Sequence, residues 1–243
     1  MLHRFFVEPS DVCGDTITIT GDDVKHISKV LRLHEKDSVL VCDSSGTDYT
    51  CEISTVSADC VTLNVVSKEK TKTEPPVNVT IYQGLPKSDK MDYIVQKCVE
   101  LGAVSIVPVI TKRTVVIPKD ESKKISRWQK IAAEAAKQSG RGIIPTVGGT
   151  VSFKDMINSL SADDLNILPY ECEKTSGLKN AIKSTKAKNI NIIIGPEGGF
   201  DEKEIELAKE KGISIVTLGP RILRCETAPI ATLSAVLYEL GDW

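Results

Sequence analysis

The sequence predicts a two-part protein, in which a small, mostly β domain precedes a larger α/β domain built on a mostly parallel sheet. Three observations support this fold class. Short segments rich in Val, Ile and Thr fill the first 66 residues. A charged stretch ending in two prolines, SKEKTKTEPP at 67–76, has the composition of a linker. After it, apolar strand-like runs alternate with helical patterns, which is typical of a parallel sheet covered on both faces.

The first domain is expected to contain four strands and one helix. Residues 22–33 place Val24, Ile27 and Leu31 on one helical face. The strands are expected where β-branched residues lie between turn residues, at 16–20, 38–42, 49–53 and 60–66.

The second domain alternates strands with helices. The helix at 88–102 has Ser88 as its predicted N-cap and Gly102 just past its end. The strands are expected at 77–85, 104–110, 166–170, 191–195 and 214–219. The helices are expected at 88–102, 121–139, 176–184, 201–212 and 226–240.

Composition excludes several classes of protein. A chain of 243 residues with 41% hydrophobic and 26% charged residues is typical of soluble globular proteins. No apolar run approaches the roughly 20 residues of a membrane helix, and the N-terminus turns acidic too early for a signal peptide. The seven scattered cysteines never form Cys-x-x-Cys, and all three histidines precede residue 35. We therefore expect a cytoplasmic protein without disulfides, a metal site or a membrane partner.

Positive charge is concentrated in the middle of the chain. Residues 75–145 carry 12 Lys and Arg against 6 Asp and Glu, whereas the segments on either side are net negative. This basic stretch fits an anionic partner, although a solvated helix face would have the same composition.

Three expected loops follow strands at one edge of the predicted sheet, where ligands of such folds bind. They cover 166–171, 189–200 and 216–229. The second surrounds Glu197 with four Gly and Pro residues, which indicates either a tight turn or a ligand that approaches the backbone closely. Neither a P-loop nor a dinucleotide fingerprint is present. Glu197 would repel phosphate, so it either faces a neutral or positive ligand or braces the turn.

The third loop carries Arg221 and Arg224 ahead of a helix that begins near Glu226 and Thr227. Thr227 is a natural N-cap, and Glu226 complements the positive end of the helix. From residue 228 to residue 240 the only charged residue is Glu239. A helix this apolar either fills the core or packs against a second copy of the chain.

These motifs resemble a known family. GPEGGF at 195–200 and LGPRILRCETAP at 218–229 are similar to the signature of the RsmE-type 16S rRNA (uridine-N3) methyltransferases of the SPOUT superfamily. The resemblance extends over nearly the whole chain, since HRFFV (3–7), HISKVLRL (26–33), QGLPKSDKMDYIVQKCVELG (83–102) and RWQKIAAEAAKQSGR (127–141) match family blocks in order. One departure is Cys225, where the family usually has Thr.

The resemblance implies a PUA-like RNA-binding β-barrel over 1–72 and a SPOUT domain with a trefoil-knotted parallel sheet over 73–243. It implies S-adenosylmethionine as cofactor and 16S rRNA as partner, within the assembled small subunit. It further implies a homodimer with each active site near the subunit interface.

It also implies site residues. Arg224 would stabilise the uracil anion, and Glu197 or Glu226 would take the N3 proton. The implied cofactor-binding residues are Leu168, Pro169, Glu171, Gly195, Pro196, Glu197, Gly198, Gly199, Leu218, Gly219, Ile222, Leu223, Arg224, Thr227 and Ala228. The implied RNA-binding residues are Arg4, Arg32, Lys87, Lys90, Arg113 and Arg141.

Two alternatives are compatible with the same motifs. One is a methyltransferase of this superfamily that acts on another RNA position. The other is a non-catalytic RNA-binding protein that keeps the fold.

Overall fold

The computed structural model of the chain describes residues 2–183 and 185–242. It divides into two compact units. Unit 1 comprises Met1–Glu74 and Ala136–Ile144, and unit 2 comprises Pro75–Ala135 and Pro145–Trp243. The sequence predicted that the chain passes from the first domain to the second once, near residue 72. In the structure, residues 136–144 also belong to the first unit. The long helix α3 (Glu121–Ser139) therefore supplies residues to both units.

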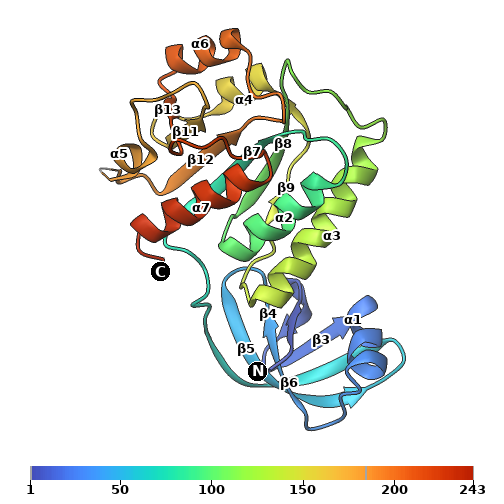
Figure 1. Cartoon of the computed structure of the whole chain (residues 1–243). Coiled ribbons are helices and arrows are strands. Elements are labelled where there is room, and N and C mark those ends of the chain that lie inside the picture. The colour runs from blue at the N-terminus through green and yellow to red at the C-terminus, as the bar shows by residue number, and fades with distance from the viewer. Residues whose placement is uncertain (1, 184, 243) are drawn as a thin grey trace. The chain divides into compact units, whose positions relative to one another are not determined.

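Unit 1 is a six-stranded sheet curled into a partly open, PUA-like barrel (Figure 1). Its first pair of strands is parallel and the others are antiparallel. The strand order is β1 (Arg4–Phe6), β4 (Ser38–Cys42), β5 (Thr47–Val56), β6 (Cys60–Lys70), β3 (Thr16–Thr20) and β2 (Val12–Cys13). A 3-10 turn, η1 (Pro9–Asp11), precedes β2, and α1 (Asp22–Lys25) runs into a π-helical turn, η2 (His26–Val30). Val24 and Ile27 are buried in the barrel core, as predicted.

Part of the expected linker is strand instead. Residues 67–70 continue β6 and pair with residues 47–50 of β5. The register of this hairpin shifts by one residue between Thr50 and Cys51 and shifts back between Ile53 and Thr55. Cross-strand pairing thus outweighs the charged, Thr-rich composition that suggested a loop.

Residues 136–144, the second stretch of unit 1, are held to the first stretch by buried polar contacts. The Arg141 side chain is almost fully buried and forms an ion pair with Glu74. The Gly142 N–H also donates to Glu74 at 2.8 Å, and the Cys42 thiol donates to the Gly142 carbonyl at 2.7 Å. A side chain at Gly142 would place its Cβ 2.1 Å from Thr71 Cγ2, so only glycine fits there.

Unit 2 confirms the predicted parallel sheet. All of its strand pairings are parallel. The order is β10 (Val151–Ser152), β8 (Ser105–Ile110), β7 (Asn78–Gly84), β12 (Asn189–Ile194), β11 (Leu165–Pro169) and β13 (Ser214–Val216), with β9 (Thr146–Val147) also beside β8. The sequence did not predict β9, β10 or α4 (Phe153–Ser159), because these elements are too short to show a clear period.

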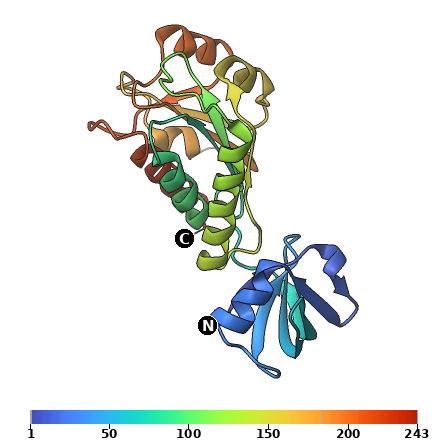
Figure 2. The ribbon, with the colours of Figure 1, turned by 90° about the vertical axis from the view of Figure 1, so that its right-hand side faces the viewer.

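Helices cover both faces of this sheet (Figure 2). On one face, Phe153 of α4 and Ile205 of α6 (Glu202–Glu210) share a core with Ile193 of β12. On the other, α2 (Lys90–Leu101) packs against α7 (Thr227–Glu239), which also contacts β12 and β7. The short helix α5 (Leu178–Ile182) joins β11 to β12.

Two predicted helix caps are wrong. Ser88 adopts a φ of +59°, and Asp89 is the N-cap of α2. Glu226 is the N-cap of α7, and Thr227 is its first residue. Gly102 does end α2, with a φ of +112° that favours glycine.

The chain beyond β11 lies beside the chain beyond β13. Gly177 bridges Thr217, and the Thr217 N–H donates to the Ser176 carbonyl at 2.8 Å.

Candidate active site

A cavity of about 490 Å³ opens at the carboxyl ends of β11, β12 and β13. All three loops singled out from the sequence contribute to it, and each belongs to unit 2. The volume lies within the range of small-molecule sites. The lining residues are Lys90, Pro169, Tyr170, Glu171, Ile194, Gly195, Pro196, Glu197, Gly199, Phe200, Thr217, Leu218, Gly219, Pro220, Arg221, Ile222, Leu223, Arg224, Cys225 and Ala228.

The first wall, the loop 195–200, is tightly packed. A Cβ on Gly84, at the end of β7, would lie 2.6 Å from Pro196, so that strand must end in glycine. The Gln83 side chain donates to the Gly195 carbonyl at 3.4 Å. Gly199 has a φ of +65°, and a Cβ there would lie 2.7 Å from Glu171 Oε1. Gly199 is therefore favoured by the positive φ of the turn, whereas the exposed Glu171 side chain could move away from a Cβ at this position.

A lysine bridges two carboxylates beside this wall. Lys90 Nζ lies 3.0 Å from Glu197 Oε1 and 3.2 Å from Glu226 Oε2. The backbone N–H of Lys87 also donates to Glu197, at 3.2 Å. The Cys225 thiol donates to Glu226 at 3.2 Å. Sequence spacing held no signal for this bridge, because its three charged residues come from distant parts of the chain.

The bridge shifts the ionisation of its members. Burial raises the pKa of Glu197, but hydrogen bonds from Lys90 and the backbone outweigh it, so the pKa ends below its ordinary value. The pKa of Glu226 is lowered in the same way, with the Cys225 thiol as its leading donor. The hydrogen bond to Glu197 raises the pKa of Lys90, and burial raises the pKa of Cys225 to about 12. At neutral pH the cluster therefore holds two anions and one cation, which favours a positively charged ligand.

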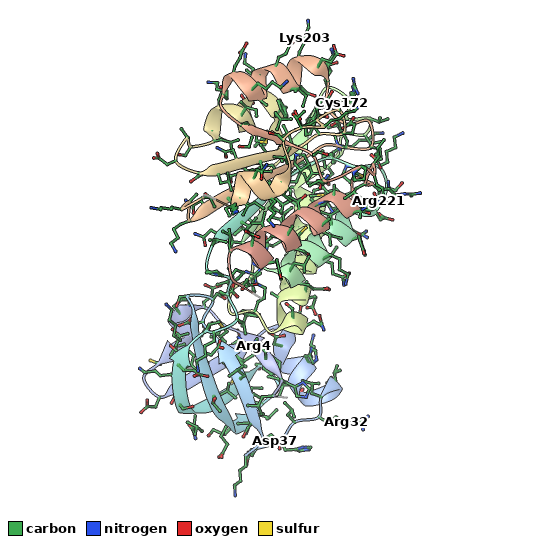
Figure 3. All side chains as sticks on the ribbon, turned by 60° about the vertical axis from the view of Figure 1, so that its left-hand side comes forward. Arg4, Arg32, Asp37, Cys172, Lys203 and Arg221 are labelled. Atoms are coloured by element: carbon green, nitrogen blue, oxygen red, sulfur yellow. The ribbon has the colours of Figure 1, made fainter. Side chains whose placement is uncertain are left out.

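The second wall, residues 217–224, is open. Ile222 is 83% exposed, and Arg221 and Arg224 are also exposed. Among the described residues, neither arginine forms an ion pair. Figure 3 shows Arg221 at the edge of unit 2. These guanidinium groups are available to an anionic partner.

Four predicted site residues do not line the cavity. Leu168 is fully buried in the core behind it. Glu226 does not line the cavity but contacts Lys90 and Cys225, which do. Thr227, the first residue of α7, does not line it either. Gly198 faces away from the cavity, since a Cβ there would lie 3.2 Å from Arg113 Cβ. The remaining predicted cofactor-binding residues line the cavity together.

The predicted RNA-binding residues separate into distinct environments. Arg4 and Arg141 are buried against carboxylates, because Arg4 pairs with Asp48 at 2.8 Å and Arg141 pairs with Glu74. Both guanidinium groups therefore have carboxylate partners within unit 1, and their assignment to RNA phosphates stays a prediction. Arg32 and Lys87 are exposed, and Figure 3 shows Arg32 at the outer edge of unit 1 and Arg4 within it.

The other two contact the cavity loops. Lys90 belongs to the bridge described above. Arg113 Nη1 donates to the Gly198 carbonyl at 2.9 Å, so this side chain is attached to the first wall.

No group of three or more His, Cys, Asp or Glu within residues 2–183 and 185–242 has the arrangement of a metal site. None of the helices described there is long and apolar enough to cross a membrane.

Two models of known protein families match the sequence of this chain. A family profile described as an RNA methyltransferase domain matches residues 73–237, and one described as an RNA methyltransferase PUA domain matches residues 19–66. Together with the parallel sheet and its loop-lined cavity, these matches define an RNA methyltransferase of the SPOUT class.

Similar proteins identify the family within this class of RNA methyltransferases. The chain is 38% identical to the ribosomal RNA small subunit methyltransferase E of Bacillus subtilis (strain 168), covering 98% of this chain and 97% of the relative. It is 32% identical to the protein of that name from Synechocystis sp., covering 97% and 77%. The chain belongs to the ribosomal RNA small subunit methyltransferase E family, which confirms the resemblance.

Solved structures support the same assignment. The crystal structure of a ribosomal RNA small subunit methyltransferase E from Neisseria gonorrhoeae bound to S-adenosyl methionine matches with a TM-score of 0.91 and 30% identity, covering both chains fully. A putative methyltransferase from Legionella pneumophila, in complex with the same cofactor, matches with a TM-score of 0.85 and 27% identity, covering 97% of each chain.

Proposed function

We propose that this protein transfers a methyl group from S-adenosylmethionine to N3 of a uridine in the 16S rRNA of the small ribosomal subunit. The observation that carries the proposal is the cavity at the sheet edge, where a bare glycine loop and a net-negative bridge face two free arginines. Family membership supports the reaction. The assembled small subunit, in the cytoplasm, is the proposed setting.

The residues present fit this cofactor. Gly195 and Gly199 leave their backbone open to close approach, and Ile194, Leu218 and Leu223 offer apolar surface. Glu171 and Glu197 place negative charge where a cation would be stabilised. S-adenosylmethionine, when bound, supplies an electrophilic methyl group on a positively charged sulfur.

The chain's own residues then act on the uracil ring. The N3 proton passes to solvent water before the nitrogen accepts the methyl group, and the uracil ring is anionic in between. Arg224, which lines the cavity without an internal ion pair, stabilises that charge. Glu197 and Glu226 have lowered pKa values, which makes each a weak proton acceptor. We therefore assign both carboxylates to holding Lys90 and assign Glu197, which lines the cavity, to facing the cationic donor.

A homodimer is proposed from the exposed face of α7. Ala231 and Ala235 are exposed, and Tyr238 is 67% exposed. These three residues lie on one side of the helix and present an apolar surface that a second copy would cover. Leu237, by contrast, is fully buried, so the substitution Leu237→Lys would report on folding rather than assembly.

The test uses small subunits purified from a strain that lacks the protein. These are incubated with the purified protein and S-adenosylmethionine, and the rRNA nucleosides are analysed by mass spectrometry. We expect one new 3-methyluridine per 16S rRNA. A different methylated nucleoside would indicate another target within the superfamily. Cofactor binding in calorimetry without any methylated product would indicate a non-catalytic RNA-binding protein.

A further inference from the structure

Three consecutive apolar residues stand exposed between β8 and α3. Val115 is 68% exposed, Val116 is 52% exposed and Ile117 is 58% exposed. Figure 1 draws this segment as a long green loop. Single exposed apolar residues are ordinary on protein surfaces, whereas a contiguous group marks a site of interaction. We call residues 115–117 the apolar tip.

The base of this loop is fastened to the first wall of the cavity. Arg113 donates to the Gly198 carbonyl at 2.9 Å, and Lys112 Nζ lies 2.9 Å from Asp201 Oδ2. The Lys112 N–H donates to Glu204 at 2.9 Å. Glu197 and Gly199, on either side of Gly198, line the cavity. The base of the loop that carries the apolar tip is therefore attached to the first wall of the candidate active site.

Positive charge is in excess around the apolar tip. Residues 112–124 contain five Lys and Arg but only two acidic residues. Lys112 is paired with Asp201, whereas Asp120 and Glu121 accept the backbone N–H groups of Lys123 at 3.0 Å and Thr150 at 2.6 Å. In the part of the chain that the structure describes, Lys119 and Lys123 form no ion pair. The charge fits phosphates, and the apolar tip fits the faces of bases.

The proposed reaction explains why an apolar group is needed there. N3 lies on the edge of uracil that forms base pairs, so the enzyme must take the base out of its stack to reach it. Extrusion leaves a gap between the neighbouring bases. Nucleic-acid-binding proteins fill such gaps with apolar side chains inserted between base steps.

We propose that Val115, Val116 and Ile117 form a wedge that enters the RNA stack beside the target uridine and holds it extruded toward the cavity. This inference rests on the proposed function and deepens it. It assigns Lys119 and Lys123 to the flanking phosphates. A wedge acts after the RNA has bound, so its loss should lower the rate at saturation. A phosphate contact contributes to binding, so its loss should raise the half-saturating concentration of RNA.

The experiment compares variants on small subunits from the strain that lacks the protein, with 3-methyluridine measured by mass spectrometry. The wedge variant changes Val115, Val116 and Ile117 to Ser. Its matched control is Val66→Ser, since Val66 is also 68% exposed but lies in unit 1. A third protein, Lys119→Gln with Lys123→Gln, removes the phosphate contacts alone. Cofactor affinity is measured by calorimetry and assembly by ultracentrifugation.

We expect the wedge variant to lose about tenfold or more of the rate at saturating small subunits, with unchanged half-saturation, cofactor affinity and assembly. The double Lys→Gln variant should instead raise the half-saturating concentration and flatten its salt dependence. The Val66→Ser control should match the unmutated protein.

Five outcomes would overturn the inference. The wedge variant could keep a rate within about twofold of the unmutated protein, or change only the half-saturating concentration. Lost cofactor binding would mean that the loop only supports the cavity, and a change in assembly would mean that the apolar tip joins two copies of the chain. If the unmutated protein itself forms no 3-methyluridine, the proposed function fails first, and the inference falls with it.

Discussion

The two walls of the cavity differ in how firmly the chain holds them. The loop 195–200 is fixed from several directions, by the packing of Pro196 on Gly84, by the Lys90 bridge and by Arg113. The loop 217–224 has few internal partners and exposes Ile222 and both of its arginines. A fixed wall suits a small cofactor that must be placed accurately, and an open wall suits a large substrate that arrives from solvent.

Strand position accounts for this difference. β12, which leads into the fixed wall, lies between β7 and β11 in the middle of the sheet. β13, which leads into the open wall, is at the end of the sheet and pairs only with β11. A central strand places its following loop among neighbours on both sides, while a terminal strand leaves one side free.

The strongest test of the open wall is Arg224→Ala. We expect the methyl-transfer rate to fall by about 10²–10³, because a donor aimed at developing charge is lost. The free energy of unfolding should change by no more than about 0.5 kcal/mol, since the exposed side chain has no internal partner. Single-turnover kinetics and denaturant unfolding measure the two quantities. Arg221→Ala on the same loop is the control, and an equal loss there would remove the special role of Arg224.

The fixed wall is tested by Gly84→Ala. The new Cβ would lie 2.6 Å from Pro196, and we expect a loss of about 1–3 kcal/mol in the free energy of unfolding, as in other overpacked sites. Cofactor affinity should fall as well. Gly177→Ala is the matched control, because nothing lies within 4 Å of its Cβ position and its φ is −78°. Equal unfolding curves for both variants would show that the wall is not tightly packed.

The open wall leads directly into α7, whose exposed face is proposed to join two copies. Ala235→Lys should raise the dimer dissociation constant by about tenfold or more, because it would bury an unpaired charge. Sedimentation at several concentrations measures the change. Lys179→Ala, an exposed substitution on α5, serves as the control. A monomeric unmutated protein at micromolar concentration would contradict the proposal.

The smallest expected effect comes from Lys90→Met. The bridge stabilises the fold only while its carboxylates are ionised. Because the pKa values of Glu197 and Glu226 are lowered from 4.5, the contribution is present above that pH and is lost as the pH falls through the folded-state values. Lys90 has a raised pKa, so its contribution fades only as the solution becomes strongly basic.

We therefore expect Lys90→Met to destabilise the fold by no more than about 1 kcal/mol near neutral pH, since the pair is partly open to solvent. The difference from the unmutated protein should shrink in acid. Unfolding curves at several pH values measure it, with Lys87→Met as the control because Lys87 contacts Glu197 through its backbone. A difference that grows in acid would contradict the assignment.

Local sequence signals identified the longer strands, the long helices and the three loops of the cavity, but not the short strands β1, β2, β9 and β10. Gly195, Gly199 and Arg224 stood out because glycines and arginines after a strand are conspicuous in any sequence. The partners of Arg4, Lys90 and Arg141 could not be predicted, since each is paired with a carboxylate far away in the chain. A positive charge in sequence does not reveal whether the fold has already neutralised it.

The apolar helix α7 illustrates the same limit. Its composition suggested burial on every side, and the structure buries Leu233, Val236 and Leu237 while leaving Ala235 and Tyr238 exposed. Hydrophobic residues on both faces predicted that something must cover the second face. They did not show which face the chain itself covers.

The division of unit 1 into two stretches has a consequence for synthesis on the ribosome. Its first 74 residues are made well before residues 136–144, which supply Arg141 and Gly142 to Glu74 and Cys42. The barrel therefore emerges with an unpaired Glu74 carboxylate and an uncovered Thr71, and it gains its last partners only after α3 has been translated. Nascent chains stalled before residue 136 should show weaker protection from proteases over residues 38–74 than chains stalled beyond residue 144 have left the exit tunnel.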